Sequence, residues 1–566
     1  MRFSATASFS AWVVLLRLGR LTLRSALVSP LFSPLFSHQR RDWPFAAIWL
    51  TLRTAAPLLN SVMNPRAFLL LACAVAGRLA HGRSADGARG MASASAGCAL
   101  RIGGCREACR GSASMNNRMH TASMTPRGAE QASSLLQQLF RSFDGSLALR
   151  LWNGTTLRLG NAELHASAPP FTLVCNHPGF VRTMVLGRDP LRLAEAYFQG
   201  HIDVEGDFFA ALGLKDHLHS IRLSLRERLG ALLTAVRLRE TTGEGAGSGS
   251  HRATLHGLAV KAPSKTENRA AISFHYDVSN EFYRLWLDEE RVYSCAYFTS
   301  PDESLDQAQR NKLEHICRKL RLQPRERLLD IGCGWGALVC WAARHHGVRA
   351  HGITLSQQQF DFAQQRIRDE GLQDSVTVEL RDYRDLAGDG VFDKVSSIGM
   401  FEHVGLANLP TYLATVQRVL RPGGLFLNHG ITHDVEGWKK SVSTEFINRY
   451  VFPDGELDCV SNIQLGMEHA GFEIHDVEGL RPHYALTLRH WVQRLEANRD
   501  AALREVDEAT YRVWRLYMAA CALDFEAGTT GIYQILASKR NRGGWPVSLS
   551  RGDLHAGRVG ALNEAH

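Results

Sequence analysis

The stretch Leu328-Leu329-Asp330-Ile331-Gly332-Cys333-Gly334-Trp335-Gly336 decides the fold of this chain of 566 residues. A short apolar run that contains one aspartate is followed by three glycines at alternating positions, and a helix-forming segment continues through Ala343. Glycines at such positions let the backbone turn tightly and come close to a ligand. No lysine followed by serine or threonine comes after them, as a loop that grips phosphates requires. The stretch therefore predicts a strand, a turn that suits a nucleoside joined to an amino acid, and a helix.

Strand-like and helical segments alternate on both sides of this turn. Further strands are expected at Arg349–Ile353, Val376–Leu380 and Phe392–Ile398. Strands that alternate with helices form a parallel sheet, and their carboxyl ends line one crevice. The sequence predicts an α/β fold, with a doubly wound Rossmann-like domain over residues 260–540.

Polar residues follow these strands. Nucleoside-binding folds commonly place an acid after the second strand to hold the ribose, but Thr354–Gln359 contains none, so Gln359 or Ser356 is expected to take that role. Asp382, after the third strand, is expected to accept a hydrogen bond from an adenine amino group. Glu402 and His403 follow the fourth strand, where an acid beside a histidine indicates a general base.

Residues 130–240 predict a smaller α+β domain. The elements expected in it are a hairpin of Leu147–Trp152 and Thr156–Leu159 around Asn153-Gly154, a strand at Phe171–Cys175 and a helix over Leu191–Leu214. Apolar residues at helical spacing continue over Ile221–Val236, with arginines on the other faces. Such a helix rests on an anionic membrane surface or packs on its own domain, and both readings stay open. The run Thr241–Ser250 indicates a flexible linker over residues 241–252.

Residues 1–125 do not show the pattern of a folded domain. Residues 1–114 hold 14 Arg, no Lys and three acidic residues, a net charge of +11, whereas the rest, with 51 basic and 53 acidic residues, carries −2. Because residues 115–566 are nearly neutral, the sequence argues against a nucleic-acid partner. We interpret the leader as translated upstream sequence, with the working start at Met115, Met119 or Met124, in preference to a secretory signal or an organellar transit peptide. The leader and the tail of residues 541–566 are expected to lack fixed structure.

The 11 cysteines lack the spacing of a secreted disulfide framework. Cys105 and Cys109 come closest to a metal-binding pair, but no second pair follows at ligand spacing. The sequence therefore predicts no metal site, and it favours the reducing cytosol as the compartment.

Several motifs occur in a fixed order along the second half of the chain. They are His275-Tyr276-Asp277-Val278-Ser279, Tyr293-Ser294-Cys295-Ala296-Tyr297-Phe298, Leu328–Gly336, Thr354–Gln359, Ser397–Gly405, His429-Gly430-Ile431-Thr432, Phe452-Pro453-Asp454-Gly455 and Pro482-His483-Tyr484-Ala485-Leu486-Thr487-Leu488. In these motifs the chain resembles the cyclopropane fatty acid synthase family, which includes the mycolic acid cyclopropane synthases. The resemblance runs from about His275 to Lys539, and a weaker one covers Leu147–Leu214. The missing acid after the second strand is also a feature of this family.

The resemblance implies an S-adenosylmethionine-dependent methyltransferase that acts on a cis double bond of an acyl chain. A carbocation follows the transfer, and loss of a proton from the new methyl group closes the ring. It also implies a bicarbonate ion as the base, held by the Cys295 main chain, Glu402, His429, the Ile431 carbonyl and Tyr484. The methyl donor is expected to contact Tyr293, Ser294, Asp330, Gly332, Gly334, Gly336, Thr354, Leu355, Ser356, Gln359, Asp382 and Tyr383. Cys521 looks like the family's active-site cysteine, and we interpret it as a buried wall residue rather than a nucleophile.

Developing positive charge on carbon favours aromatic faces in the pocket. The candidates are Tyr276, Phe282, Tyr297, Phe298, Phe401 and Tyr484, of which about half are expected to be ordinary core residues. The predicted function is cyclopropanation of unsaturated phospholipid chains by a cytoplasmic enzyme at the inner face of the membrane, with the smaller domain presenting the lipid. Related enzymes suggest a homodimer. A branched lipid, an O- or N-methylated small molecule and a non-catalytic lipid-binding protein are the alternatives, and Glu402, His429 and Tyr484 together favour methylation of carbon.

Overall fold

The computed structural model describes residues 126–160, 170–186, 190–221, 278–437, 442–452 and 455–554, with five further residues between 224 and 233. The chain divides into two units, Met1–Asn117 and Arg118–His566, and all described elements belong to the second. Several predictions fall outside the described residues. They concern the leader of residues 1–125, most of the helix over Ile221–Val236, the linker of residues 241–252, His275-Tyr276-Asp277 and Pro453-Asp454.

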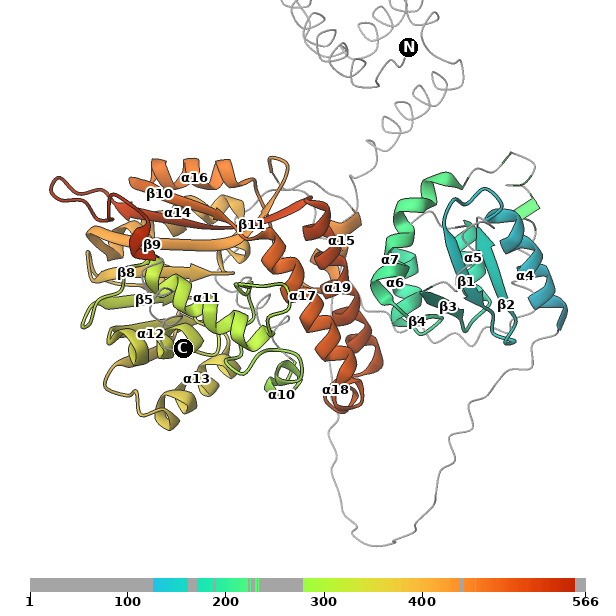
Figure 1. Ribbon diagram of the computed structural model, residues 1–566, viewed down its shortest axis with the longest axis horizontal. Coiled ribbons are helices and arrows are strands. Elements are labelled where there is room, and N and C mark those ends of the chain that lie inside the picture. The colour runs from blue at the N-terminus through green and yellow to red at the C-terminus, as the bar shows by residue number, and fades with distance from the viewer. Residues whose placement is uncertain are drawn as a thin grey trace, which may run out of the picture. The chain divides into compact units, whose positions relative to one another are not determined.

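A sheet of seven strands in the order β10-β11-β9-β8-β5-β6-β7 forms the centre of the larger domain (Figure 1). The five strands β5 to β9 run parallel, and β11 is antiparallel to both β9 and β10. The strands are β5 (Arg327–Ile331), β6 (Arg349–Thr354), β7 (Val376–Leu380), β8 (Phe392–Ile398), β9 (Leu420–His433), β10 (Phe472–Gly479) and β11 (Thr530–Lys539). The chain runs outward from β5 to β7 and returns to β8 on the other side of β5, so the topological switch point lies between β5 and β8. The predicted doubly wound α/β fold is confirmed.

Helices cover both faces of this sheet, because neighbouring strand residues point to opposite sides. Leu328 belongs to a core cluster with α11 (Leu305–Lys319), α12 (Ala337–His346) and α13 (Gln357–Asp369). Leu329 belongs to another cluster, with α14 (Leu409–Val419) and α16 (Val460–His469). Short 3-10 turns η4 (Tyr383–Asp385), η5 (Phe401–His403) and η6 (Leu406–Asn408) follow the ends of β7 and β8.

A third cluster, rich in aromatic side chains, lies beside the sheet. It is built from α10 (Asn280–Arg284), α15 (Val442–Tyr450), α17 (Arg481–Ala497), α18 (Arg499–Glu505) and α19 (Glu508–Ala527). Trp286 and Trp491 are fully buried there, with ring centroids 5.5 Å apart. Residues 541–554, assigned to the tail from the sequence, end in η7 (Gly552–Leu554), and Val547 packs against the α11–α13 cluster.

The smaller domain has a sheet of four strands in the order β2-β1-β3-β4. Its elements are α4 (Pro126–Leu139), β1 (Ser146–Arg150), β2 (Thr156–Gly160), β3 (Phe171–Cys175), α5 (Gly179–Leu186), α6 (Pro190–Phe198), β4 (Ile202–Gly206), α7 (Phe208–Gly213) and η3 (Leu214–Ser220). β1 and β2 pair as an antiparallel hairpin, and Gly154 in its turn has φ 86°. The predicted hairpin and the strand at Phe171–Cys175 are confirmed. None of the described helices combines the length and apolarity that a membrane crossing needs.

The predicted helix over Leu191–Leu214 is wrong. The chain forms α6, leaves the helix at Gly200 with φ 72°, and then adds β4 antiparallel to β3. Gly206, with φ 89°, ends that strand, and Asp207 caps α7 by accepting a hydrogen bond from the Ala210 amide at 3.0 Å. Two glycines in the left-handed region and an aspartate N-cap therefore divide the segment into three elements.

Candidate active site

The glycine turn after β5 lies at the topological switch point. Gly332, Gly334 and Gly336 all have positive φ, at 82°, 55° and 85°, a backbone region that side chains disfavour. A Cβ at Gly334 would meet nothing within 4 Å, so this glycine is required by its backbone conformation. Gly336 is the residue before α12, and a Cβ on it would come within 3.2 Å of Ala363. The turn thus brings backbone to the edge of a cavity, as the sequence predicts.

A cavity of about 140 Å³ adjoins this turn, and we call it the donor pocket. Ten of the residues expected to contact the methyl donor line it: Tyr293, Ser294, Asp330, Gly332, Gly334, Thr354, Leu355, Gln359, Asp382 and Tyr383. Gly336 and Ser356 do not line it. The Ser356 hydroxyl instead caps α13 by accepting from the Gln359 amide at 3.4 Å. Of the two candidates for the missing ribose acid, Gln359 is therefore the one that reaches the donor pocket.

Asp382 is held in place by the residue two positions later. Arg384 donates to its carboxylate from Nε at 2.8 Å and from Nη2 at 2.7 Å. The carboxylate also accepts from the Arg384 amide at 2.9 Å and so caps η4. Beside it the Tyr383 hydroxyl is buried with no hydrogen-bond partner among the described residues. At this end of the donor pocket, the Asp382 carboxylate is an acceptor held in place by Arg384, and the Tyr383 hydroxyl has no partner among the described residues.

A buried lysine that the sequence analysis missed lies at the other end of the donor pocket. Lys312 of α11 is 2% exposed, and its ammonium group donates to the Ser294 hydroxyl at 3.1 Å. Burial lowers the pKa of Lys312 to about 8, and the carboxylates of Asp288 and Asp330 oppose that shift. Burial raises the pKa of Asp330 to about 6, against a hydrogen bond that Ser396 donates to it at 2.7 Å. The ammonium group of Lys312 and the carboxyl groups of Asp288 and Asp330 therefore form a buried charge cluster next to Ser294.

A larger cavity of about 550 Å³, which we call the acyl pocket, adjoins the donor pocket. All six residues expected to be catalytic line it: Cys295, Glu402, His429, Ile431, Tyr484 and Cys521. The two pockets share one boundary, formed by Tyr293, Ser294, Ile398, Gly399 and His403. Most other lining side chains are apolar. The fold thus places the donor pocket next to a larger, mostly apolar cavity, and the same five residues line both.

Glu402 presents one oxygen to the protein and leaves the other without a partner. Its Oε1 accepts from the Ile431 amide at 2.8 Å, whereas its buried Oε2 has no hydrogen-bond partner among the described residues. Burial raises the pKa of Glu402 to about 7. A carboxyl with this pKa changes its protonation state near neutral pH, as a proton-handling group requires.

His429 is fully buried, and its Nε2 has no partner within the described part of the chain. The amide nitrogen of Gln534 lies 3.4 Å from its Nδ1. With Gln534 donating through its amide nitrogen, Nδ1 accepts and the proton of the neutral ring lies on Nε2. Burial holds the pKa of His429 well below its usual value, so the ring stays neutral at pH 7. His429 thus presents a neutral ring nitrogen without a partner among the described residues to the acyl pocket.

The cysteines of the acyl pocket lack the surroundings of a nucleophile. Burial raises the pKa of the Cys295 and Cys521 thiols far above the usual range. A thiol becomes reactive when its pKa is lowered, so the shift runs in the opposite direction. Neither thiol therefore has the environment that would make it a nucleophile.

The aromatic lining differs from the one expected from the sequence. Of the candidates within the described residues, only Tyr484 lines the acyl pocket, while Phe282, Tyr297, Phe298 and Phe401 do not. The other aromatic lining residues are Tyr293, Phe446, Phe452, Tyr517 and Phe525. Tyr293 was expected to contact the methyl donor, whereas the other four could not be predicted because they come from α15, α19 and loops that the tertiary fold brings together. Phe401 packs instead behind Glu402, in the cluster on the α14 side of the sheet.

Gly430 has no side chain, and the side chains of Phe401 and Glu402 occupy the space where its Cβ would lie. A Cβ at Gly430 would overlap the Phe401 ring and lie 3.0 Å from Oε1 of Glu402. We expect Gly430→Ala to lower the free energy of unfolding by about 1–3 kcal/mol, as overpacking does, and to reduce activity. Chemical denaturation checks this. Gly213→Ala, where a Cβ meets nothing within 4 Å, is the control, and equal stability of the two variants would contradict the prediction.

The switch-point turn, the donor pocket and the adjoining acyl pocket define a Rossmann-like methyltransferase. The family model for mycolic acid cyclopropane synthetase matches residues 263–535. A probable fatty acid methyltransferase of Pseudomonas putida is 43% identical over 395 residues, which cover 69% of this chain and 92% of that protein. The cyclopropane-fatty-acyl-phospholipid synthase of Escherichia coli is 40% identical over 276 residues, which cover 48% of this chain and 69% of that protein.

A solved structure of mycolic acid cyclopropane synthase CmaA1, complexed with SAH and CTAB, has 33% identity and a TM-score of 0.45 and covers 48% of this chain and 98% of that one. The identity and coverage of the Pseudomonas relative establish the family. The chain belongs to the cyclopropane synthase family of S-adenosylmethionine-dependent methyltransferases.

Proposed function

We propose that the protein transfers the methyl group of S-adenosylmethionine to a cis double bond of a phospholipid acyl chain, and that ring closure gives a cyclopropane. One observation carries this proposal. The acyl pocket is largely apolar, yet it contains two buried polar atoms without partners in the described chain, Oε2 of Glu402 and Nε2 of His429. An apolar chamber suits an acyl chain, and the polar pair suits the removal of a proton from carbon.

The donor pocket supports the first half of the reaction. S-adenosylmethionine, when bound, supplies an electrophilic methyl group. The turn Gly332–Gly336 brings backbone to the nucleoside, and Gln359 offers its side-chain amide where many nucleoside sites have an acid. Tyr293 and Ser294 belong to both pockets, so they border the path between donor and acceptor. An alkene is a weak nucleophile, and alignment in a dry site provides most of the rate enhancement.

The residues of the acyl pocket support the second half of the reaction, in which the cation forms and the ring closes. Aromatic faces of Tyr293, Tyr484 and Tyr517 stabilise positive charge on carbon without adding to it. Tyr484 lies 4.8 Å from Phe525, ring to ring, which fixes its orientation. No enzyme nucleophile is needed, in keeping with the raised pKa values of both thiols.

The residues around Glu402 fit a bicarbonate ion. Oε2 of Glu402 is an acceptor when ionised, and Nε2–H of His429 is a donor, so together they match an ion with one O–H and two acceptor oxygens. Cys295, Ile431 and Tyr484 line the same chamber and would complete the contacts. Bicarbonate held there would accept the proton that ring closure releases.

A second outcome of the same chemistry is a methyl-branched or methylene-branched fatty acid. The Pseudomonas relative is named a probable fatty acid methyltransferase, and its match covers more of this chain than that of the Escherichia synthase. Both reactions begin with methyl transfer to a double bond. The ring closes when the new methyl group loses a proton and bonds to the cationic carbon. A methylene branch needs a hydride shift before the same methyl group loses a proton, and a saturated methyl branch needs a hydride donor as well. The product rather than the pocket therefore distinguishes them.

Product analysis tests the proposal. Purified protein is incubated with methyl-labelled S-adenosylmethionine and vesicles of cis-unsaturated phospholipid, and the acyl chains are analysed by mass spectrometry. We expect a gain of one CH₂ that survives hydrogenation conditions that reduce alkenes. A labelled chain that takes up hydrogen under those conditions would establish the methylene-branched product. Labelled amines or alcohols without labelled lipid would contradict both functions.

A further inference from the structure

Helix α6 of the smaller domain belongs to two cores at once. Ala196 is buried in the core cluster of the smaller domain, and Leu193 packs against the same cluster. Leu191, Tyr197 and Phe198 are buried in the aromatic cluster of the larger domain. Through α6 the smaller domain therefore packs directly into the core of the larger one.

One face of α6 also reaches the acyl pocket. Leu191 and Ala194 both line it, and residues three apart lie on the same side of a helix. The same pocket is lined by Phe446 and Ile447 of α15 and by Leu516 of α19, two helices that pack against α6. The family model begins at residue 263 and therefore leaves α6 outside its match. The family model therefore assigns no role to the part of the pocket lining that α6 contributes.

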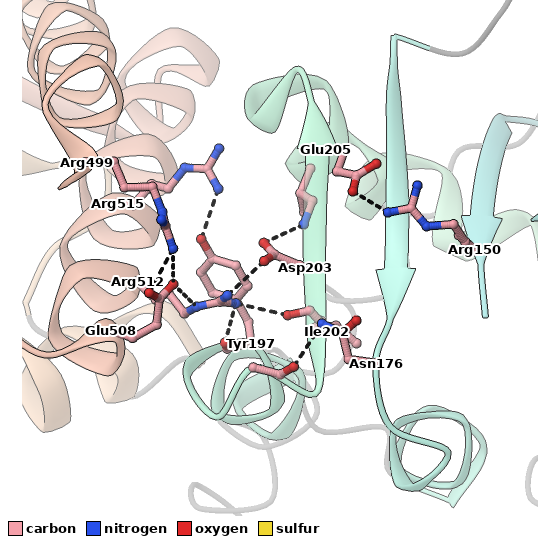
Figure 2. Close-up of polar contacts among 12 residues, drawn as sticks. Arg150, Asn176, Tyr197, Ile202, Asp203, Glu205, Arg499, Glu508, Arg512 and Arg515 are labelled. Atoms are coloured by element: carbon pink, nitrogen blue, oxygen red, sulfur yellow. Dashed lines mark hydrogen bonds and ion pairs between the residues drawn. The ribbon is translucent and has the colours of Figure 1, made fainter. Parts of the chain in front are cut away.

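A buried arginine fixes the end of α6. Arg512 of α19 is 7% exposed, and its Nη1 donates to the carbonyls of Tyr197 at 3.0 Å and Ile202 at 3.1 Å (Figure 2). Its Nη2 contacts Asp203 at 2.8 Å, and its Nε contacts Glu508 at 2.9 Å. Arginine presents its donors in a rigid fork, so four contacts through one guanidinium define both position and orientation.

Further contacts join α6, and the neighbouring helix α7, to α19 and α15. Arg515 donates to the Tyr197 hydroxyl at 3.1 Å, and its guanidinium lies 3.8 Å from the ring centre of Phe208. On the side of α15, Tyr450 donates to Glu195 at 3.0 Å, and the Phe198 ring lies 5.2 Å from the Tyr450 ring. Because α6 is anchored to both α15 and α19, its pocket-lining residues Leu191 and Ala194 are held in place relative to the lining residues of those two helices.

We propose that Ala194 and Leu191 select the length of the acyl chain that the enzyme methylates. This inference rests on the proposed function and adds a specificity determinant to it. The small side chain of Ala194 leaves space in the acyl pocket that a larger side chain would fill. The side chain of Leu191, one helical turn away, already occupies the neighbouring space. In an apolar pocket, room for one methylene changes discrimination by about 10–200-fold. The smaller domain therefore takes part in substrate selection as well as in lipid presentation.

A competition assay tests this role. Vesicles carry equal amounts of cis-monounsaturated phosphatidylcholines that differ by two carbons beyond the double bond, and the ratio of methylated long to short chains is measured. Ala194→Phe should lower that ratio by at least about tenfold, because the ring fills the chamber. Leu191→Ala should raise the ratio, because it enlarges the chamber. Arg192→Phe, at an exposed position of the same helix, should leave the ratio unchanged.

Each outcome decides between the alternatives. Opposite shifts in the two pocket variants, with no shift in Arg192→Phe, support the inference. Unchanged ratios in active pocket variants overturn it and leave the proposed function standing. If Ala194→Phe does not fold, Leu191→Ala decides the question alone. A wild-type protein that methylates none of the lipids overturns the proposed function and the inference with it.

Discussion

Replacing Glu402 with glutamine should lower the rate of lipid methylation by about 10²–10⁴-fold, the usual contribution of a positioned acid–base group. Glutamine keeps the shape and the oxygen that accepts from the Ile431 amide, but it puts an amide nitrogen where Oε2 lies without a partner. Glu402 lines the acyl pocket and not the donor pocket, so affinity for S-adenosylhomocysteine should not change. Single-turnover kinetics and calorimetric titration measure the two quantities.

Glu456→Gln is the matched control for this variant. Glu456 lies next to Glu402 in space, since its amide donates to the Glu402 carbonyl at 3.3 Å, but it does not line either pocket. Its carboxylate accepts from the Leu406 amide at 2.8 Å, which the glutamine oxygen can also do. We expect near wild-type rates. If Glu402→Gln loses cofactor affinity, the residue belongs to the donor site and our assignment is wrong.

The pH dependence of the reaction should report the same carboxyl group. Burial raises the pKa of Glu402 to about 7 from an ordinary value of 4.5. If the ionised form is the active one, kcat/KM rises with pH through about 7. The stability of the fold should change in the opposite sense, because a raised folded pKa contributes stability at low pH that is lost as pH rises through 7. Glu402→Gln should therefore lose the kinetic rise and gain stability relative to wild type at pH 8.

Replacing Lys312 with methionine should lower the free energy of unfolding by about 3–5 kcal/mol, as the loss of one partner from a buried charge cluster does. The ammonium group contacts Ser294 at 3.1 Å, and its charge lowers the pKa values of Asp288 and Asp330. Without it both carboxyl groups stay buried without a compensating cation. Ser294 also loses its donor at the boundary of the two pockets, so cofactor affinity should fall as well. Chemical denaturation and titration with S-adenosylhomocysteine test the two effects.

A double variant separates charge from packing. Adding Asp330→Asn to Lys312→Met removes one of the carboxyl groups left without its cation, and the asparagine oxygen can still accept from Ser396. The double variant should therefore be more stable than Lys312→Met alone. Additive losses would mean that Lys312 stabilises the fold through its apolar stem and not through its charge. In that case the charge cluster beneath Ser294 would have no part in the stability of the site.

The residues at the strand ends could be predicted from the sequence because a parallel sheet brings the carboxyl ends together. Asp330 is the second-last residue of β5, Asp382 and Glu402 follow β7 and β8, and each lines one of the two pockets. Ser356 was taken as a ligand candidate although Ser356-Gln357-Gln358-Gln359 has the pattern of a helix capping box. That local signal was present, and it accounts for the position of Ser356 outside the donor pocket.

The remaining features depend on tertiary packing. Lys312 was overlooked because lysine in a helix is usually solvated, yet it lies four residues from both Ala308 and Ile316, which are fully buried. A lysine within an apolar stripe is the signal that could have revealed it. The wall formed by α6 had no such signal, because residues 191–214 were interpreted as one helix and the packing of α6 against α19 depends on Arg512, more than three hundred residues away in the chain.

The boundary shared by the two pockets has a consequence for altering the enzyme. Tyr293, Ser294, Ile398, Gly399 and His403 touch both chambers, so a substitution among them changes donor affinity and lipid preference together. Helix α6 meets only the acyl chamber, through Leu191 and Ala194. Lipid preference can therefore diverge, by natural drift or by directed selection, through α6 while the donor chamber remains unaltered.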